Sequence, residues 1–363
     1  VVPGSAADAA LPSDWGDRVD AAAYRARVAA SWVTEVPVFD REPIRYEPGL
    51  PRPRIPSSLP AASGGSNGDG ERGEIERLGP VGPVYRCAAG TVILRRVRLP
   101  QEADAAIFAE LTQYSAGDAY DRTGSIFLLP ASGDSGRRGP DGGAAVSFLD
   151  ALRDSVGVLP QTIGRDGRAY QGIAAAGGYR PPLELIRFIT PFGIRQYNEQ
   201  VTVRGLAWED SARYTVDLSE LAPALRGEVW IGAFIGNYDA GGHVVSLKLR
   251  YHPNRKEAAA ADAEAPRVWI EPLFNTANVL EMAGQEYGRI FAQDSLTVEF
   301  DLPAGLARCT LRYLTTGHGG WGGGDEFNPK VNTILLDGRV VASFAPWRSD
   351  CGAYRRWNPA SGN

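Results

Sequence analysis

The stretch Val229-Trp-Ile-Gly-Ala-Phe-Ile235, followed after seven residues by His243-Val-Val-Ser-Leu-Lys-Leu-Arg-Tyr251, is typical of the β-strands that decide the fold of this chain. Such short runs of Val, Ile, Leu and aromatic residues, bounded by glycine, proline and aspartate, predict strands. Further strands of the first part of the chain are predicted at residues 91–99, 105–112, 125–129, 185–192, 200–204 and 212–218. About eight strands at this spacing favour an antiparallel β-sandwich or jelly roll.

The overall composition fits an all-β protein with many turns. The 363 residues include 43 glycines and 26 prolines, and 44% of the residues are hydrophobic. This length is enough for two or three domains. No run approaches the roughly 18 apolar residues that a membrane-spanning helix needs. The formal net charge of −5 provides no general basic field for nucleic acid.

Four segments can be distinguished along the chain. Residues 1–77 form an N-terminal extension, for which we predict a short helix between Asp14 and Trp32 and then a Pro/Gly-rich linker. Residues 78–253 hold the first jelly-roll domain, in which residues 146–156 predict a short helix. The polar, alanine-rich residues 254–265 form a linker, and residues 266–363 form the second jelly-roll domain.

The second domain contains a glycine-rich loop that could face a ligand. Its strands are predicted at residues 296–300, 309–314, 333–337 and 340–344, and Asp337-Gly338 indicates a hairpin. Residues 317–324 include six glycines, and the large side chains among them are His318 and Trp321. Glycine lets a ligand approach the backbone closely, and an aromatic face beside a carboxylate suits a sugar. The alternative is an unimportant surface loop.

Two acidic residues could carry chemistry. Asp121 lies between Tyr120 and Arg122, and Glu326 ends the glycine-rich loop beside Phe327. A carboxylate next to an aromatic ring and an arginine can act as a general base or orient water and substrate. The alternative for Asp121 is a turn aspartate that is bonded to its own backbone or paired with Arg122.

Metal and cofactor motifs are not found. The three histidines and three cysteines have no zinc-ligand spacing. The chain has neither a Gly-x-Ser-x-Gly elbow nor a phosphate-binding glycine loop that ends in Lys-Ser or Lys-Thr. We therefore predict an enzyme or binding protein without a metal or cofactor.

Three motifs in the same order resemble the peptide-N-glycosidase F family, bacterial peptide-N4-(N-acetyl-β-glucosaminyl)asparagine amidases. Thr315-Thr-Gly-His-Gly-Gly-Trp-Gly-Gly-Gly-Asp-Glu-Phe-Asn328 is similar to the second-domain signature, and the match continues to Cys351. Asp118-Ala-Tyr-Asp-Arg-Thr123 is similar to the family's catalytic aspartate segment, and Arg187-Phe-Ile-Thr-Pro-Phe192 also matches. Residues 1–77 lie outside the resemblance.

The resemblance implies two adjacent jelly rolls with the active site between them. The reaction implied is cleavage of the amide between asparagine and the innermost N-acetylglucosamine of an N-linked glycan, which leaves aspartate and a glycosylamine. By motif position, Asp121 is the essential acid acting through water, and Glu326 supports it. The implied substrate-binding residues are Arg122, Tyr120, Phe327, His318 and Trp321.

The chain departs from the family pattern at several places. The family has a third acid on the strand of residues 229–235, and a match without gaps places Phe234 at its position. Asp239 lies nearby and is the alternative if the gap is elsewhere. The cysteines of the family's disulfides beside the two acids are missing. The family also has further strands after the position of Asn363, with a cysteine that pairs with the equivalent of Cys351. We therefore expect a second chain from the same precursor, disulfide-linked through Cys351, and a secreted or periplasmic protein.

Three other functions are considered. A non-catalytic jelly-roll carbohydrate-binding module is favoured by Phe234 in place of the third acid. A copper monooxygenase shares the expected architecture but needs paired histidines such as His-x-His, which this chain lacks. A glycosidase would use two carboxylates at the sugar carbon and leave N-acetylglucosamine on asparagine. Turnover of a glycopeptide separates these alternatives from the amidase.

Overall fold

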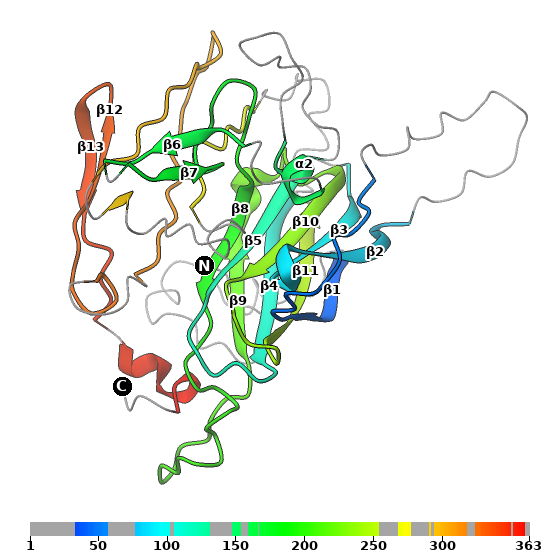
Figure 1. Ribbon diagram of the computed structural model, residues 1–363. Coiled ribbons are helices and arrows are strands. Elements are labelled where there is room, and N and C mark those ends of the chain that lie inside the picture. The colour runs from blue at the N-terminus through cyan, green and yellow to red at the C-terminus, as the bar shows by residue number, and fades with distance from the viewer. Residues whose placement is uncertain are drawn as a thin grey trace, which may run out of the picture.

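The computed structural model describes residues 33–56, 77–101, 105–130, 147–153, 159–165, 167–253, 268–276, 290–291, 294–317, 324–349 and 351–359 (Figure 1). The helix predicted between Asp14 and Trp32 and the predicted linker of residues 254–265 lie outside the described residues. No helix among the described residues is both long and apolar enough to cross a bilayer.

The described secondary structure is nearly all β, which confirms the predicted fold class. The strands are β1 (Thr34–Ile44), β2 (Gly79–Cys87), β3 (Val92–Leu99), β4 (Ala105–Ser115), β5 (Thr123–Pro130), β6 (Gln161–Ile163), β7 (Ala169–Gln171), β8 (Leu183–Ile189), β9 (Ala212–Asp217), β10 (Gly227–Ile235), β11 (His243–Pro253), β12 (Asn332–Leu336) and β13 (Arg339–Phe344). The helical segments are α2 (Phe148–Arg153) and the short 3-10 turns η1 (Ala88–Gly90), η3 (Ser219–Leu221) and η6 (Cys351–Trp357). The helix predicted within residues 146–156 is confirmed as α2.

Two antiparallel sheets form the first domain. Sheet A has the strand order β1-β11-β4-β9, and sheet B has the order β2-β3-β10-β5-β8. The connection from β4 to β5 passes from sheet A to sheet B. The connection from β10 to β11 passes back from sheet B to sheet A. Both crossings lie at the same end of the sandwich, since β10 ends where β5 begins and β11 begins where β4 ends.

The apolar alternation of the strands fills the space between the sheets. Side chains such as Ile107 and Leu247 from sheet A and Ile126 and Ile231 from sheet B are fully buried in one cluster. β10 is a nearly continuous apolar run because it is buried on both faces. Its Trp230 and Phe234 pack on the other side of sheet B, in a second cluster that α2, residues 159–179 and Ile290 help to form.

The expected boundary of the first domain requires a correction. We expected residues 1–77 to lie outside the sandwich, but β1 is a strand of sheet A and pairs with β11 along most of its length. Its Val36, Val38 and Ile44 are buried in the core between the sheets. The sequence did not predict this strand because Pro37 and Pro43 lie within it and proline disfavours strands. β1 is an edge strand of sheet A, where proline is tolerated.

Three strand predictions are wrong. Residues 200–204 form a loop, because Gly205 has a φ of 78° and turns the chain, and Val203 is 39% exposed. Residues 296–300 and 309–314 are not strands either. A strand requires a hydrogen-bonded neighbour, and the described part of the second domain supplies such pairing at β12 and β13 alone.

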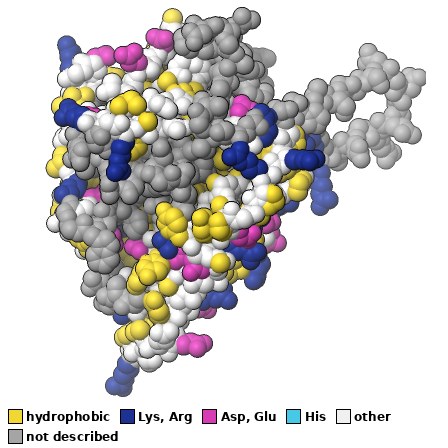
Figure 2. Space-filling model, in the orientation of Figure 1, with side chains coloured by type: hydrophobic (Ala, Val, Ile, Leu, Met, Phe, Trp, Pro, Cys, Tyr) yellow, Lys and Arg dark blue, Asp and Glu magenta, His cyan; other side chains and the backbone are white. Residues whose placement is uncertain are grey.

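The predicted hairpin of the second domain is confirmed. β12 and β13 pair antiparallel, and the turn residues Asp337 and Gly338 have φ values of 49° and 75°. Positive φ at both central residues is the requirement of a type I′ turn, which Asp-Gly meets. The hairpin exposes several apolar side chains, among them Leu335, Val340 and Val341. Figure 2 shows hydrophobic side chains interspersed with charges of both signs on the face in view.

Several segments of the second part of the chain contact the first domain. Residues 268–276 form a β-bridge between Phe274 and Ala174, and Asn275 donates its backbone N–H to the Ile173 carbonyl at 2.8 Å. At the C-terminal end, Trp357 of η6 donates its indole N–H to the Ser211 carbonyl at 3.2 Å. Between these two segments, Asp294 Oδ2 accepts the Arg165 N–H at 3.2 Å, so the first domain is contacted at several places along the second part.

Candidate active site

The loop of residues 116–122 connects β4 to β5 and carries the predicted Asp121. It lies against the loop of residues 236–242, because the backbone N–H groups of Ala116 and Asp118 donate to the Gly242 carbonyl at 2.9 and 3.3 Å. Gly117 and Gly241 meet at the contact, where a Cβ on Gly117 would lie 2.7 Å from the Gly241 Cα. Glycine at these positions allows the two loops to approach each other at the end of the sandwich.

The side chain of Asp118 accepts several hydrogen bonds in this loop. Its side chain is fully buried, and Oδ2 accepts from Arg122 Nε at 2.8 Å while Oδ1 accepts from Arg122 Nη2 at 3.3 Å. Oδ1 also accepts the Tyr120 backbone N–H at 3.0 Å. Burial by itself raises the pKa of Asp118, but the neighbouring His243 ring and the hydrogen bonds from Arg122 and the Tyr120 backbone outweigh it and lower the pKa to about 2. Asp118 is therefore ionised near neutral pH.

His243 supports Asp118 from the start of β11. Its ring is 1% exposed, and Nε2 lies 3.6 Å from Asp118 Oδ2. On the other side, Gln113 Nε2 lies 2.9 Å from His243 Nδ1. An amide nitrogen donates, so Nδ1 accepts and the Nε2 side of the ring faces the Asp118 carboxylate. A buried row of Gln113, His243 and Asp118 thus fixes the position of Arg122.

The peptide units on both sides of Asp121 are held by one buried residue, Thr190, which directly follows β8. Its hydroxyl accepts the Arg122 N–H at 2.7 Å and donates to the Tyr120 carbonyl at 3.0 Å. Its own N–H donates to the Arg122 carbonyl at 2.9 Å. Asp121 itself is half-buried. The fold thus places a partly exposed carboxylate on a backbone that is bonded at three points.

Arg122 lies between two exposed tyrosine rings. Its guanidinium carbon is 4.9 Å from the centroid of the Tyr120 ring and 5.7 Å from that of Tyr238. The two rings are 58% and 60% exposed. The aromatic row continues in both directions, because Tyr238 contacts Tyr46 edge-to-face and Tyr120 contacts Phe192 in the same way. Exposed rings around a fixed guanidinium form a surface on which sugar faces can stack.

The predicted second-domain residues come from a separate loop. Glu326 is half-buried and Phe327 is 62% exposed, and both follow Gly324 on the way to β12. His318 and Trp321, predicted to bind substrate, lie outside the described residues. Tyr120, Asp121 and Arg122 lie together on one loop, and the roles predicted for them and for the second-domain residues stay predictions.

The position expected for a third acid lies in the core. Phe234 is fully buried in the cluster on the outer side of sheet B, among side chains that include Tyr170 and Trp230. Asp239, the alternative, is exposed in the loop after β10, and its Oδ1 accepts the Gly241 N–H at 2.6 Å. Its neighbour Tyr238 stacks on Arg122, so Asp239 is at the same end of the sandwich as Asp121.

Sequence reasoning missed Asp118, Thr190, His243 and Tyr238 as parts of this site. Asp118 and Thr190 lie inside the two first-domain motifs that match the family, but their spacing does not reveal which carboxylate is buried. His243 and Tyr238 are distant in sequence from Asp121, and only the pairing of β11 with β4 brings them close.

Neither of the two cysteines whose side chains are described belongs to this site. Cys87 is 1% exposed in the core, and burial raises the pKa of its thiol to about 12. Cys309 is exposed, and both cysteines are free thiols. The side chain of Cys351 is outside the described residues, so the disulfide to a second chain stays a prediction.

Comparisons with known proteins identify the family. Residues 35–251 match the N-terminal domain of peptide-N-glycosidase F, and residues 286–363 match its C-terminal domain. Crystal structures of PNGF-II in two space groups are similar, with 39% identity and a TM-score of 0.73. The match covers 98% of this chain but 59% of PNGF-II, so the chain spans somewhat more than half the length of that protein.

Other comparisons are weaker. PNGase F, a glycosylasparaginase from Flavobacterium meningosepticum, matches at 11% identity and a TM-score of 0.27, over 61% of this chain and 42% of that chain. A search of curated proteins found no match. The matching N-terminal model begins within β1, in agreement with the place of that strand in the sandwich. The chain belongs to the peptide-N-glycosidase F family.

Proposed function

We propose that the protein is an amidohydrolase that releases N-linked glycans by cleaving the amide between asparagine and the innermost N-acetylglucosamine. The products are a peptide with aspartate at that position and a glycosylamine, which then loses ammonia. The observation that carries the proposal is the 116–122 loop, where Thr190 holds the backbone around Asp121 and Asp118 holds Arg122 beside it. Family membership supports it.

In this proposal Asp121 is the general base. Its half-exposed carboxylate takes a proton from water as the water oxygen attacks the asparagine side-chain carbonyl carbon. The same proton then goes to the departing glycosylamine nitrogen when the C–N bond breaks. Bonding of Thr190 to both neighbouring residues keeps the carboxylate in place, since a displacement of about 1 Å can reduce a rate roughly a hundredfold.

Arg122 is proposed to bind the developing oxyanion or the sugar carbonyl. Asp118 uses its Nε and one Nη2 hydrogen, which leaves the remaining N–H donors for substrate. Because the Asp118 pKa is about 2, this partner is always charged at neutral pH, and the guanidinium is held without loss of its own charge. Fixed donors aimed at developing charge are among the strongest contributions to catalysis.

The aromatic rings are proposed to hold the chitobiose core. Tyr120 and Tyr238 flank Arg122 and are exposed enough to stack on sugar faces. Glu326, Phe327, His318 and Trp321 are proposed to approach the substrate from the second domain. Asp239, beside Tyr238, is a candidate for a further carboxylate contact to sugar hydroxyls.

The test is mass spectrometry of an N-glycopeptide incubated with the protein. We expect free glycan and a peptide with aspartate in place of the glycosylated asparagine. Asp121→Asn keeps the shape but cannot accept a proton, so release should fall by about a hundredfold or more. Asp301→Asn, the same change at an exposed carboxylate of the second domain, should leave the rate unchanged.

Other products would overturn the proposal in defined ways. A peptide that retains one N-acetylglucosamine would make the protein a glycosidase. An intact glycopeptide that stays bound to the protein would make it a carbohydrate-binding module. Full activity of Asp121→Asn would show that another group is the base.

A further inference from the structure

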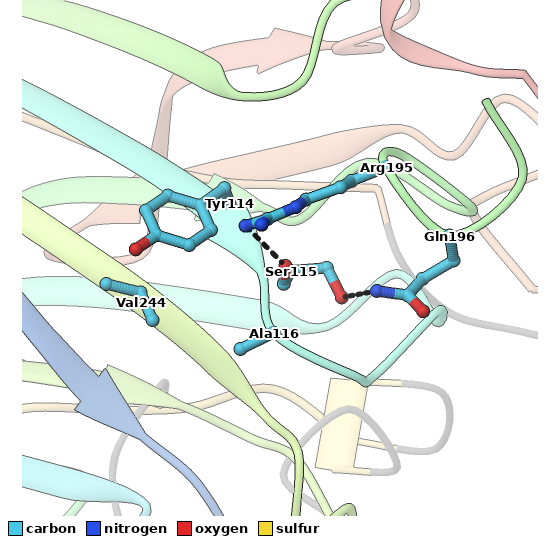
Figure 3. A pocket seen from close by; sticks show the side chains of 6 residues that line it. All are labelled: Tyr114, Ser115, Ala116, Arg195, Gln196 and Val244. Carbon is cyan, nitrogen blue, oxygen red and sulfur yellow. Dashed lines mark hydrogen bonds between the residues drawn. The ribbon is translucent and has the colours of Figure 1, made fainter. Parts of the chain in front are cut away.

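A cavity that the proposed reaction does not use lies behind the 116–122 loop. It has a volume of about 360 Å³ and is lined by Tyr114, Ser115, Ala116, Arg195, Gln196 and Val244 (Figure 3). Tyr114 alternates with the buried Gln113 and Ser115, so its ring is on the outer face of sheet A. Val244, its register partner on β11, forms the apolar side of the cavity. This volume is within the usual range for small-ligand sites.

Two arginines flank the Tyr114 ring. The Arg195 guanidinium carbon is 4.9 Å from the ring centroid and that of Arg41 is 5.8 Å from it. Figure 3 shows the Arg195 side chain running alongside the ring, with the Gln196 amide at the other side of Ser115. Within the described part of the chain, neither guanidinium forms an ion pair with a carboxylate.

Two other cations on the same face differ from these two arginines. Farther along sheet A, Lys248 and Arg250 are both paired with Glu35 and Glu110. The cavity end of the sheet therefore carries positive charge that the described carboxylates do not neutralise. Guanidiniums that the described carboxylates do not neutralise are favourable partners for an anion.

The backbone at both arginines is strained. Arg41 has a φ of 53° and Arg195 a φ of 66°, in the left-handed region that costs a residue other than glycine about 1–2 kcal/mol. Each strained residue is held by a hydrogen bond from its own N–H, to Ser246 Oγ and to Asn198 Oδ1, both at 2.9 Å. Backbone strain of this kind is concentrated at ligand sites.

The cavity shares a wall with the candidate active site. Ser115 Oγ accepts from Gln196 Nε2 at 3.0 Å and donates to the Asp118 carbonyl at 2.5 Å. Gly193, two residues before Arg195, donates its N–H to the Ala119 carbonyl at 2.7 Å. A group bound in the cavity is thus next to the loop that carries Asp121.

We propose that this cavity binds an anionic monosaccharide unit, with the carboxylate or phosphate on the Arg195 guanidinium and the sugar ring against Tyr114 and Val244, while Arg41 adds positive charge beside the same tyrosine ring. The guanidinium fork matches the oxygens of either anion, and the aromatic and apolar walls suit a sugar face. The inference rests on the proposed function in one respect: the anionic monosaccharide is taken to be part of the N-linked glycan of the substrate.

The test measures binding of isolated sugars to the full chain by titration calorimetry or NMR. The probes are N-acetylneuraminic acid for a carboxylate, glucose 6-phosphate for a phosphate and N-acetylglucosamine as the neutral control. The variant is R41N/R195N, because asparagine tolerates a positive φ better than most residues and the fold should be retained. The matched control is R226N, which removes an exposed arginine directly before the first residue of β10.

We expect at least one acidic probe to bind wild type and R226N alike, and to bind R41N/R195N about tenfold more weakly or worse. Binding should also weaken with added salt. The probe that binds identifies the anion as a carboxylate or a phosphate. Equal binding to all three proteins, tighter binding of the neutral sugar, or no binding of either acidic probe overturns the proposal.

A second readout separates this inference from the proposed function. In R41N/R195N, release of glycans ending in the acidic sugar should slow relative to release of neutral glycans, whereas R226N should preserve the wild-type ratio. If the protein releases no glycan at all, the amidase proposal fails while the calorimetric result still decides whether the cavity binds anionic sugars. If R41N/R195N no longer binds the acidic probe but keeps the wild-type ratio of acidic to neutral glycan release, the anion that the cavity binds is not part of the substrate glycan.

Discussion

Asp118 shows how one buried carboxylate organises the site at the scale of single residues. It receives two hydrogen bonds from Arg122 and one from the Tyr120 backbone, and His243 lies behind it. Since these donors favour the charged form, the folded-state pKa falls from the ordinary value of 3.8 to about 2. We therefore propose that Asp118 is a positioning residue, with Asp121 as the general base.

Asp118→Asn should therefore lower both stability and activity. Because the folded pKa is below the unfolded one, the ionised carboxylate stabilises the fold fully above about pH 4, by about 2 kcal/mol, and this contribution is lost as the pH falls through about 2. Urea unfolding of wild type and variant at pH 7 should show this difference in unfolding free energy, and the difference should shrink as the pH approaches 2.

A structural role alone would predict something different for catalysis. If Asp118 positions Arg122 for the reaction, kcat of the variant should fall while KM changes less, because Arg122 is proposed to act on developing charge. Asp301→Asn should change neither stability nor rate by a measurable amount, since its carboxylate is exposed. A pH-independent stability difference would contradict the assignment.

At the scale of elements, the end of β8 supports the loop that enters β5. β5 and β8 are neighbours in sheet B, and Thr190 directly follows the last residue of β8, Ile189. The three hydrogen bonds between Thr190 and the 120–122 backbone extend the ladder past the ends of the strands. This pairing brings the segment of residues 187–192 next to the Asp121 segment.

Thr190→Val is a nearly isosteric change that removes the hydroxyl and both of its hydrogen bonds. The buried Tyr120 carbonyl and Arg122 N–H lose a partner, so the free energy of unfolding should fall by about 1–3 kcal/mol. Glycopeptide turnover should fall as well, because the backbone around Asp121 is released. Both quantities can be measured by urea unfolding and by the mass-spectrometric assay.

The matched change is Thr215→Val in β9, a half-buried position at the register partner of Glu110. It should leave turnover unchanged. If Thr190→Val loses stability but keeps full turnover, the hydrogen bonds of Thr190 serve the fold and not the position of Asp121.

At the scale of the whole molecule, η6 joins the C-terminal end of the chain to the first domain. Glu209 donates its N–H to the Arg356 carbonyl at 3.0 Å, and the Arg355 guanidinium is 4.5 Å from the Trp208 ring centroid. Trp357 adds its hydrogen bond to Ser211. Together with the contacts of residues 268–276, these bonds make the position of the second part depend on the first.

Trp357→Phe keeps an aromatic ring but removes the indole donor. We expect a loss of about 1 kcal/mol in the docking of η6, seen as roughly fivefold faster hydrogen exchange at the Glu209 amide and within η6. Trp347→Phe, at a 47% exposed tryptophan of the same domain, is the control and should leave exchange unchanged. Faster exchange in both variants would indicate a general loosening of the domain instead.

The sequence by itself determined the all-β class, most strands of the sandwich, α2, the Asp337-Gly338 hairpin and the family motifs. These features depend on local periodicity and turn chemistry, which neighbouring residues contain. β10 was recognisable because a strand buried on both faces is apolar throughout. The strand at 34–44 was not, because its prolines resemble an irregular arm unless its edge position in sheet A is known.

Only the tertiary structure decided which carboxylate of the 118–122 segment is buried and which is half-exposed. That distinction depends on His243, Gln113 and Thr190, which strand pairing brings to Asp118 and Asp121 from remote parts of the chain. It also decided that Phe234 is core and that two arginines, 154 positions apart, flank one tyrosine. Burial and electrostatic pairing are properties of residues that meet in space, and sequence spacing does not specify those meetings.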